Sequence, residues 1–313
     1  MNTLTEKIII PAWLLIKDDT RLKRFFFFPG LLSIVVYSVI LTYQVIYTYV
    51  KIFWKKVKVL ELILNFIHSS YFFEVVVSAG TLVLLYVFLT PICEGALIRY
   101  IDEKQHRERV SFSDAIGVGL FRFLSIFEYN NIFSQFRFTT IFNAYLFTLR
   151  LIGIEYIRQL SYVFFGAFIF WMIMNVLFAY AKYEIVIKGV GVLSAIWSSI
   201  KITTLNPKVT LKLYFLMFFL NIKVLLNFLV FLVFPIWFFS ALVFISSQFF
   251  LYITLFVIGL LFLFFVFVLG YMSAVLEIFQ TAIWYYAYIE WKRRVDEVES
   301  GGRGGWGDEH QEH

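Results

Sequence analysis

Several apolar runs in this chain are long enough to cross a lipid bilayer. The clearest are residues 25–50 and 249–271, which reach the roughly 20 residues needed to span a hydrocarbon core of about 30 Å. The chain is 61% hydrophobic and 15% charged, which leaves too little polar surface to cover a water-soluble globule of this size. These features predict an all-α, polytopic integral membrane helix bundle.

We expect about six transmembrane helices, joined by amphipathic helices that lie at the membrane surface. The expected spans are residues 25–50, 71–92, 138–157, 161–181, a segment within 211–245, and one beginning near 249. The expected surface segments are residues 3–16, 51–70, 112–127 and 192–204. Three regions follow from this layout: a cytoplasmic interfacial segment 1–24, a six-span membrane domain 25–291 and a disordered cytoplasmic tail 292–313.

The distribution of basic residues orients this layout. Most of the 27 Lys and Arg fall in segments that six spans with cytoplasmic termini place inside, although the external linker 51–70 carries four lysines. We therefore predict a multi-pass protein of the inner (plasma) membrane with both termini cytoplasmic. The net charge of +6 suits anionic lipid headgroups at the inner face and does not require nucleic acid. The sequence also leaves open whether the protein binds protein partners or forms a homo-oligomer.

The stretch from residue 178 to residue 207 predicts a change from a span to a surface helix. It contains, in order, the end of an apolar run, a charged cluster, two glycines, an amphipathic segment and the pair Asn206-Pro207. The charged residues are Lys182, Glu184 and Lys188, and the glycines are Gly189 and Gly191. A helix over 192–204 should end at Asn206, because the residue before a proline is disfavoured in helical geometry.

Three glutamates suggest an internal repeat. Glu94, Glu184 and Glu277 each lie near the predicted inner end of an even-numbered span, and each is followed by an Ala-Ile pair. The pairs are Ala115-Ile116, Ala195-Ile196 and Ala282-Ile283. This pattern favours three tandem units of two spans and an interfacial helix. The distance from glutamate to pair varies, so coincidence stays an open alternative.

Ionisable and polar residues in the apolar regions are the candidate functional residues. A charge at bilayer depth is costly unless it is paired or hydrated, so such residues often mark a substrate or ion path. The candidate polar pathway comprises Arg150, Glu184, Glu277, Gln280 and Glu94. In this interpretation Arg150 recognises an anion and the carboxylates exchange protons. The structural alternative is that acids such as Glu277 only lie near span ends.

The sequence contains no recognisable catalytic motif. A Walker loop, a metal-spaced histidine pair within a helix and a serine elbow are all missing. We therefore predict that the chain is not an enzyme and that it uses neither a metal nor a cofactor.

Residues 183–199, YEIVIKGVGVLSAIWSS, resemble a segment of a broad group of prokaryotic six-helix membrane proteins. That group includes the membrane domain attached to some glycerophosphodiester phosphodiesterases, whose soluble catalytic domain has no counterpart here. The basic-Phe-Pro-Gly start of the first span and residues 91–95 are similar to CysZ-like sulfate permeases. The first resemblance implies a six-helix fold, and the second implies anion transport.

Two functions are compatible with these observations. The first is a membrane scaffold or accessory factor in envelope or lipid homeostasis, in which no continuous polar path joins Arg150 to the inner glutamates. The second is a transporter or channel for a small solute, most simply an anion, in which Arg150, Glu184, Glu277 and Gln280 line one hydrated cavity.

Overall fold

The computed structural model describes residues 4–36, 65, 67–106, 111–134, 138–220 and 248–301. The described part of the chain is all-helical and contains no strand, which confirms the predicted class. It divides into two compact units. The first comprises Met1–Thr20, Pro91–Asn221 and Ile278–His313, and the second comprises Arg21–Thr90 and Ile222–Glu277.

Three helical segments within the described ranges are long and apolar enough to cross a membrane. They are Phe72–His106, Ile157–Lys188 and Gly259–Glu297. Large apolar side chains such as Phe73, Phe165 and Phe264 are exposed along them, as expected of surfaces that face lipid. These helices indicate a membrane location. Most of the predicted spans 25–50 and 211–245, and most of the linker 51–70, lie outside the described residues.

Helix α5 (Phe72–His106) continues past the predicted end of the second span at residue 92. It runs through Pro91, whose nitrogen has no hydrogen to donate to the carbonyl of the preceding turn. The Thr90 hydroxyl donates to the Tyr86 carbonyl oxygen at 2.7 Å. Beyond Pro91 the helix is mostly buried as far as Asp102, so we attribute its continuation to the packing gained there. The sequence also predicts that the polar stretch from residue 99 leads away into water, whereas Tyr100, Ile101 and Asp102 are buried.

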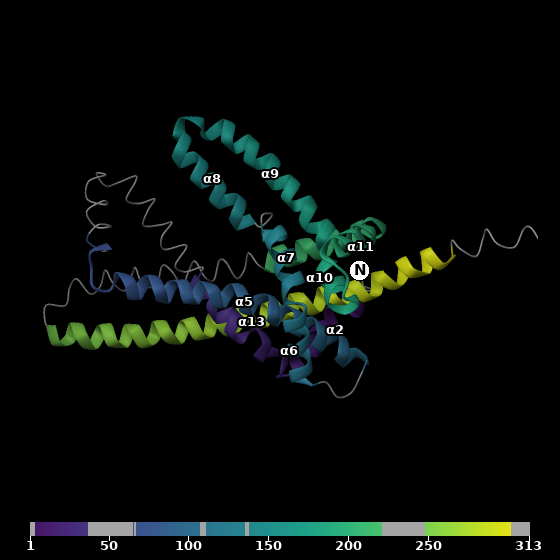
Figure 1. The fold of residues 1–313 in the computed structure, drawn as a ribbon, viewed down its shortest axis with the longest axis horizontal. Helices are drawn as coiled ribbons and strands as arrows, with labels where there is room; N and C mark the ends of the chain where they lie inside the picture. Colours follow the sequence, from purple (N-terminus) through teal and green to yellow (C-terminus); the bar gives the residue numbers. More distant parts are fainter. Residues whose placement is uncertain are drawn as a thin grey trace, which may run out of the picture. The chain divides into compact units, whose positions relative to one another are not determined.

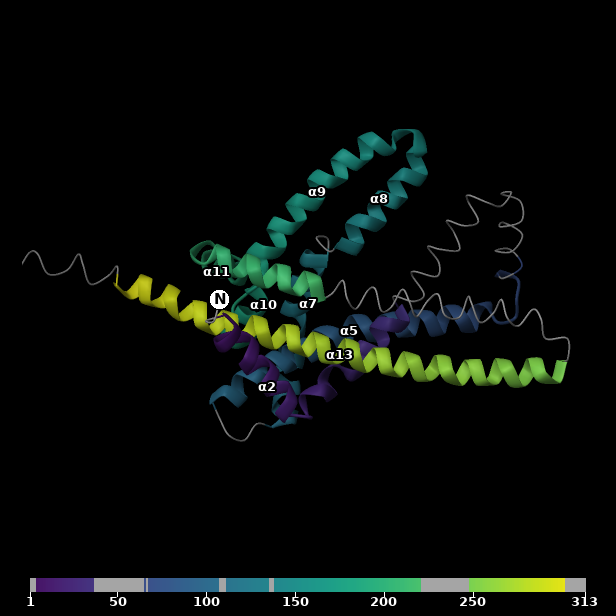
Figure 2. The same cartoon turned by 180° about the vertical axis from the view of Figure 1, so that it is seen from behind.

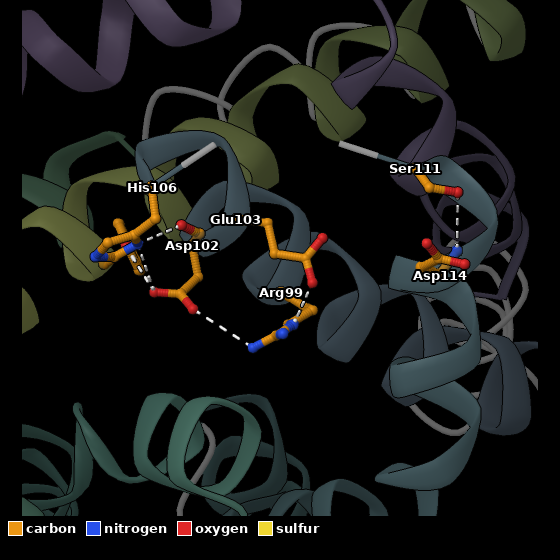
Figure 3. Close-up of polar contacts among 7 residues, drawn as sticks. Arg99, Asp102, Glu103, His106, Ser111 and Asp114 are labelled. Atoms are coloured by element: carbon orange, nitrogen blue, oxygen red, sulfur yellow. Dashed lines mark hydrogen bonds and ion pairs between the residues drawn. The ribbon is translucent and has the colours of Figure 1, made fainter. Parts of the chain in front are cut away.

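The predicted surface helix over 112–127 is two helices, α6 (Phe112–Phe121) and α7 (Phe123–Ser134), separated at Arg122. Ser111 caps α6 as its spacing predicts, because its hydroxyl accepts a hydrogen bond from the Asp114 amide at 3.4 Å. Figure 3 shows this cap at the start of α6. The break at Arg122 changes the direction in which the following residues face.

Helix α6 packs through small residues, whereas the three- and four-residue spacing of Phe112, Ile116 and Leu120 predicts a stripe of large ones. Ala115 and Gly119 are buried, whereas Leu120 and Phe121 are exposed. A Cβ atom on Gly119 would lie only 2.3 Å from the Ile92 carbonyl oxygen of α5. The two helices therefore approach closely at a small-residue crossing, a common device in membrane proteins.

Helices α8 (Phe138–Ile152) and α9 (Ile157–Phe178) form a hairpin that is visible in both Figure 1 and Figure 2. Gly153, with a φ of 112°, and the short helix η2 (Ile154–Tyr156) make its turn. The hydroxyls of Tyr145 and Ser161 lie 3.1 Å apart across the hairpin. The predicted third span, 138–157, therefore ends at Ile152, because the chain turns at Gly153.

After α9 the chain forms two short helices and one longer one, of which the sequence predicts the longer one. These are α10 (Ala181–Tyr183), η3 (Glu184–Lys188) and α11 (Val192–Leu205). Helix α11 confirms the predicted amphipathic segment, and it ends at Asn206. A further helix starts at once and is described over 207–220.

Gly189 ends η3 in a conformation that favours glycine. Its φ is +70°, and its carbonyl oxygen accepts a hydrogen bond from the Arg122 guanidinium at 3.3 Å. A Cβ atom at this position would lie 2.1 Å from Arg122 Nη2. Two features therefore favour glycine at this position: the left-handed backbone conformation and the close approach of the Arg122 side chain.

We expect Gly189→Ala to lower the free energy of unfolding by about 2 kcal/mol, since a left-handed alanine costs about 1 kcal/mol or more and Arg122 must also move. The measurement is thermal unfolding of the purified protein in detergent. Gly191→Ala is the control, because φ there is −67° and no neighbour lies within 4 Å of the added atom. Equal losses in the two variants would contradict the explanation.

The ends of the described chain are also helical. The predicted N-terminal surface segment corresponds to η1 (Thr5–Ile9) and α2 (Ile10–Asp18). The last helix, α13 (Gln248–Gly301), passes the predicted domain boundary at 291. The Trp and Tyr residues over 284–291 predict an aromatic belt at the inner membrane interface, but Tyr285 and Tyr288 are fully buried in the first unit. The three-region division stays a prediction.

Candidate functional site

Four carboxylates are buried in the first compact unit, each no more than 8% exposed. They are Asp19, Glu94, Asp102 and Glu184. Each contacts polar side chains from at least one other helix, and we call these carboxylates and their partners the polar cluster. A buried carboxylate needs such partners, because an unpaired charge away from water is very unfavourable.

Glu94 joins three helices. From α5, its Oε1 lies 2.7 Å from Nζ of Lys182 on α10, and its Oε2 accepts a hydrogen bond from the Asn130 amide of α7 at 3.1 Å. Both ionic partners are largely buried, with 10% and 17% of their side-chain surfaces exposed. The Lys182 ammonium also lies 5.6 Å from the ring centre of Tyr183. This pair is thus enclosed by protein and is poorly screened by water.

Glu184 is the most deeply buried of the four, with 2% of its side chain exposed. It accepts a hydrogen bond from the Ser198 hydroxyl at 2.9 Å, and it lies 3.2 Å from Nζ of Lys292 and 3.5 Å from Nζ of Lys188. The Tyr288 side chain also lies close to Glu184. Glu184 therefore connects η3 to α11 and to the C-terminal part of α13.

Asp102 connects α5 to α13, because it accepts a hydrogen bond from the Tyr285 hydroxyl at 2.9 Å. Two side chains on its own helix flank it, as Figure 3 shows: Arg99 lies 3.6 Å away, and His106 Nδ1 is 3.9 Å from the carboxylate and 2.8 Å from the Asp102 carbonyl oxygen. Arg99 also bonds to Glu103 at 2.8 Å.

Asp19, at the end of α2, connects that helix to α5. It accepts a hydrogen bond from the Tyr100 hydroxyl at 2.9 Å and pairs with Lys104, both on α5. The polar cluster thus ties the N-terminal helix to α5 at one side, and α5 to the later helices at the other.

An open depression of about 690 Å³ lies beside Asp102. Its lining comprises Asp102, His106, Ile187, Lys188, Tyr288, Ile289, Lys292, Arg293, Asp296 and Glu297. Its cationic side chains are thus accompanied by three carboxylates, and Lys292 also contacts Asp296 at 3.7 Å. Charges of both signs make this surface less selective for anions than a purely basic pocket.

Two of the five predicted pathway residues, Glu94 and Glu184, belong to the polar cluster. Gln280 and Glu277 lie one turn apart on α13 and are partly buried, and Glu277 falls in the second unit. Arg150 is in the last turn of α8, and its side chain is outside the described part of the structure. The shared pathway therefore stays a prediction.

Sequence reasoning missed the residues of α13 that complete the cluster. Tyr285, Tyr288 and Lys292 are spaced at three and four residues, so they lie on one face of a helix. Their aromatic character suggested a membrane interface, whereas the burial of both tyrosines shows an interior role. The signal that could have identified them is their regular spacing, which places two hydroxyls and an ammonium on one face of the helix.

The polar cluster is suited to holding helices together. Each carboxylate has donors in the protein itself, and the described ranges contain no group of three or more His, Cys, Asp or Glu that could hold a metal ion.

No protein-family model matches the chain, and no curated protein or solved structure matches it. Function must therefore be argued from the geometry.

Proposed function

We propose that this protein is a six-span scaffold or accessory factor of the inner membrane, with cytoplasmic termini and a role in envelope or lipid homeostasis. The placement of basic residues in the predicted inner segments supports this orientation. The full burial of Ala115, Ala195 and Ala282 is consistent with tandem repetition of a hairpin unit. The proposal includes lipids as direct partners, and it includes no enzymatic activity.

The observation that carries the proposal is that the buried carboxylates are engaged within the protein. Glu94 and Glu184, two candidates for a polar path, contact Lys182 and Lys292 from other helices. A carboxylate held in a buried ion pair stays charged and stationary, whereas a transport site must exchange its partners during each cycle. The cluster therefore fits a rigid platform better than a path.

The alternative is a transporter or channel for a small anion. The depression described above favours it, because Lys188, Lys292 and Arg293 are among the residues that line it. Asp296 and Glu297 on the same lining weaken this interpretation, since they repel an anion. Transport would also give a role to Arg150, which lies near the end of a predicted span.

Anion flux into liposomes distinguishes the two functions. We expect the reconstituted protein to give no saturable uptake of sulfate, phosphate or chloride above that of empty liposomes. Lys292→Gln and Arg150→Gln should likewise leave the background unchanged. Saturable uptake that disappears in Arg150→Gln, at a melting temperature equal to that of the unmodified protein, would replace the scaffold by the transporter.

A further inference from the structure

We propose that α11 and the start of the next helix form a docking surface for anionic phospholipid headgroups. The surface, here called the lipid-docking face, comprises Leu193, Trp197, Leu205, Lys208 and Lys212. It shares no residue with the polar cluster, to which α11 contributes Ser198. The inference rests on the proposed membrane function for its setting and adds a specific ligand class and location.

The inward face of α11 combines apolar and hydroxyl side chains: Val192, Ala195 and Ile202 are buried beside Ser199 and Thr203. The two hydroxyl residues bond to the end of α9. The Ser199 hydroxyl donates to the Leu177 carbonyl oxygen at 2.7 Å and accepts from the Tyr180 amide at 3.1 Å. The Thr203 hydroxyl donates to the Val176 carbonyl oxygen at 3.3 Å. These contacts satisfy backbone groups that the end of a helix leaves unpaired.

The outward face of α11 carries its largest apolar side chains. Leu193 is 80% exposed and Trp197 is 63% exposed, and Leu205 continues the same side of the helix. A tryptophan in this position is typical of the membrane interface, where its ring can contact lipid while its N–H reaches water or headgroups. Fixed by its polar inward contacts, α11 cannot rotate to bury these residues.

The charge around this face identifies the lipid class. The chain contains no Asp or Glu between Glu184 and Glu277, although it contains several lysines there. Lys208 and Lys212 are exposed at the start of the helix that follows α11. Lysines beside exposed apolar side chains favour a surface that is both apolar and negatively charged, as an anionic bilayer is.

The helix over 207–220 shows where the bilayer begins. From Leu211, which lies between the two lysines, it exposes Leu211, Phe215 and Phe219 at four-residue steps on one side of the helix. A basic start followed by an apolar stripe is the pattern expected where a helix enters the membrane. The lipid-docking face therefore lies at the level of the headgroups, with α11 along the surface.

A nitroxide placed beside this face tests the inference in the full chain. The label is attached to Ser194→Cys in a Cys93→Ala background, so that Leu193 and Trp197 stay in place. We expect it to report a depth of about 5–10 Å, with greater access to oxygen than to a water-soluble nickel complex, in vesicles that contain phosphatidylglycerol. The same label at Glu297→Cys, near the exposed polar end of α13, should report water.

The two lysines supply the decisive comparison. In the double variant Lys208→Gln/Lys212→Gln, the equilibrium constant for docking on phosphatidylglycerol should fall by about fivefold for each lysine. The depth of the nitroxide should then approach its depth in vesicles of phosphatidylcholine alone. A depth that is independent of phosphatidylglycerol, a water-like signal, or a label shielded from both reagents by protein would each overturn the inference. Melting temperature reports the polar cluster separately, so the proposed scaffold can stand while the lipid surface fails.

Discussion

Replacing Lys182 with methionine should lower the free energy of unfolding by about 3 kcal/mol, because a buried carboxylate that loses its ionic partner is strongly destabilising. The substitution keeps the length and apolar stem of the side chain but removes the ammonium that lies 2.7 Å from Glu94. The Asn130 amide would remain as a donor, so some compensation survives. Thermal unfolding in detergent, followed by tryptophan fluorescence, measures the change.

Two further variants separate charge burial from a general loss of packing. Lys7→Met removes the pair between Lys7 and Glu290, whose lysine is 53% exposed, and it should cost less than about 1 kcal/mol. Lys182→Met/Glu94→Gln removes both buried charges and should recover at least half of the loss. A double variant as unstable as Lys182→Met would show that the carboxylate is not the cause.

Gly119→Ala should be nearly as damaging, with an expected loss of about 3 kcal/mol from overpacking. The added Cβ atom would lie 2.3 Å from the Ile92 carbonyl oxygen and 2.9 Å from the Ala96 amide nitrogen, both of which are backbone atoms. Backbone cannot move aside as a flexible side chain can, so α6 must separate from α5. Thermal unfolding in detergent should report this separation.

Gly117→Ala is the matched control for this crossing. Gly117 lies in the same helix, and no atom lies within 4 Å of a Cβ added to it. Alanine should therefore stabilise the protein by about 0.5–1 kcal/mol, the usual gain over glycine in a helix interior. A loss at both positions would mean that α6 tolerates no alanine for some reason other than its contact with α5.

The sequence was informative where local chemistry decides the backbone. The break at Gly189 and Gly191, the helix over 192–204 and its stop at Asn206 follow from rules that involve only neighbouring residues. The Ser111 cap is of the same kind. Such features can be predicted without knowing what each helix packs against.

Prediction was less successful where tertiary packing overrides a local rule. Pro91 normally ends a helix, yet α5 continues because the residues beyond it are buried. Gly119 looked like a gap in an apolar stripe but is the contact point of α6, since only a small residue allows the backbones to approach. Large apolar residues could not identify the inward face, because lipid accepts them as readily as a protein core does.

In the candidate site, too, some residues could be predicted from local sequence and others only from tertiary packing. Glu94 and Glu184 were found because an acid near an apolar run is unusual in any context. Asp102 was overlooked among the polar residues near the end of α5, and Lys292 within a basic group in the last helix. Their partners, such as Tyr285, are distant in sequence, so only the folded chain reveals that these ordinary residues are buried together.

The contact between Arg122 and Gly189 also carries an evolutionary expectation. The arginine separates α6 from α7, and its guanidinium occupies the space that a side chain at position 189 would need. The two positions should therefore covary among homologous chains: a residue larger than glycine at 189 should be accompanied by a shorter one at 122. Such a pair of changes would also remove the hydrogen bond that connects these helices, so we expect it only in lineages that have acquired another connection between them.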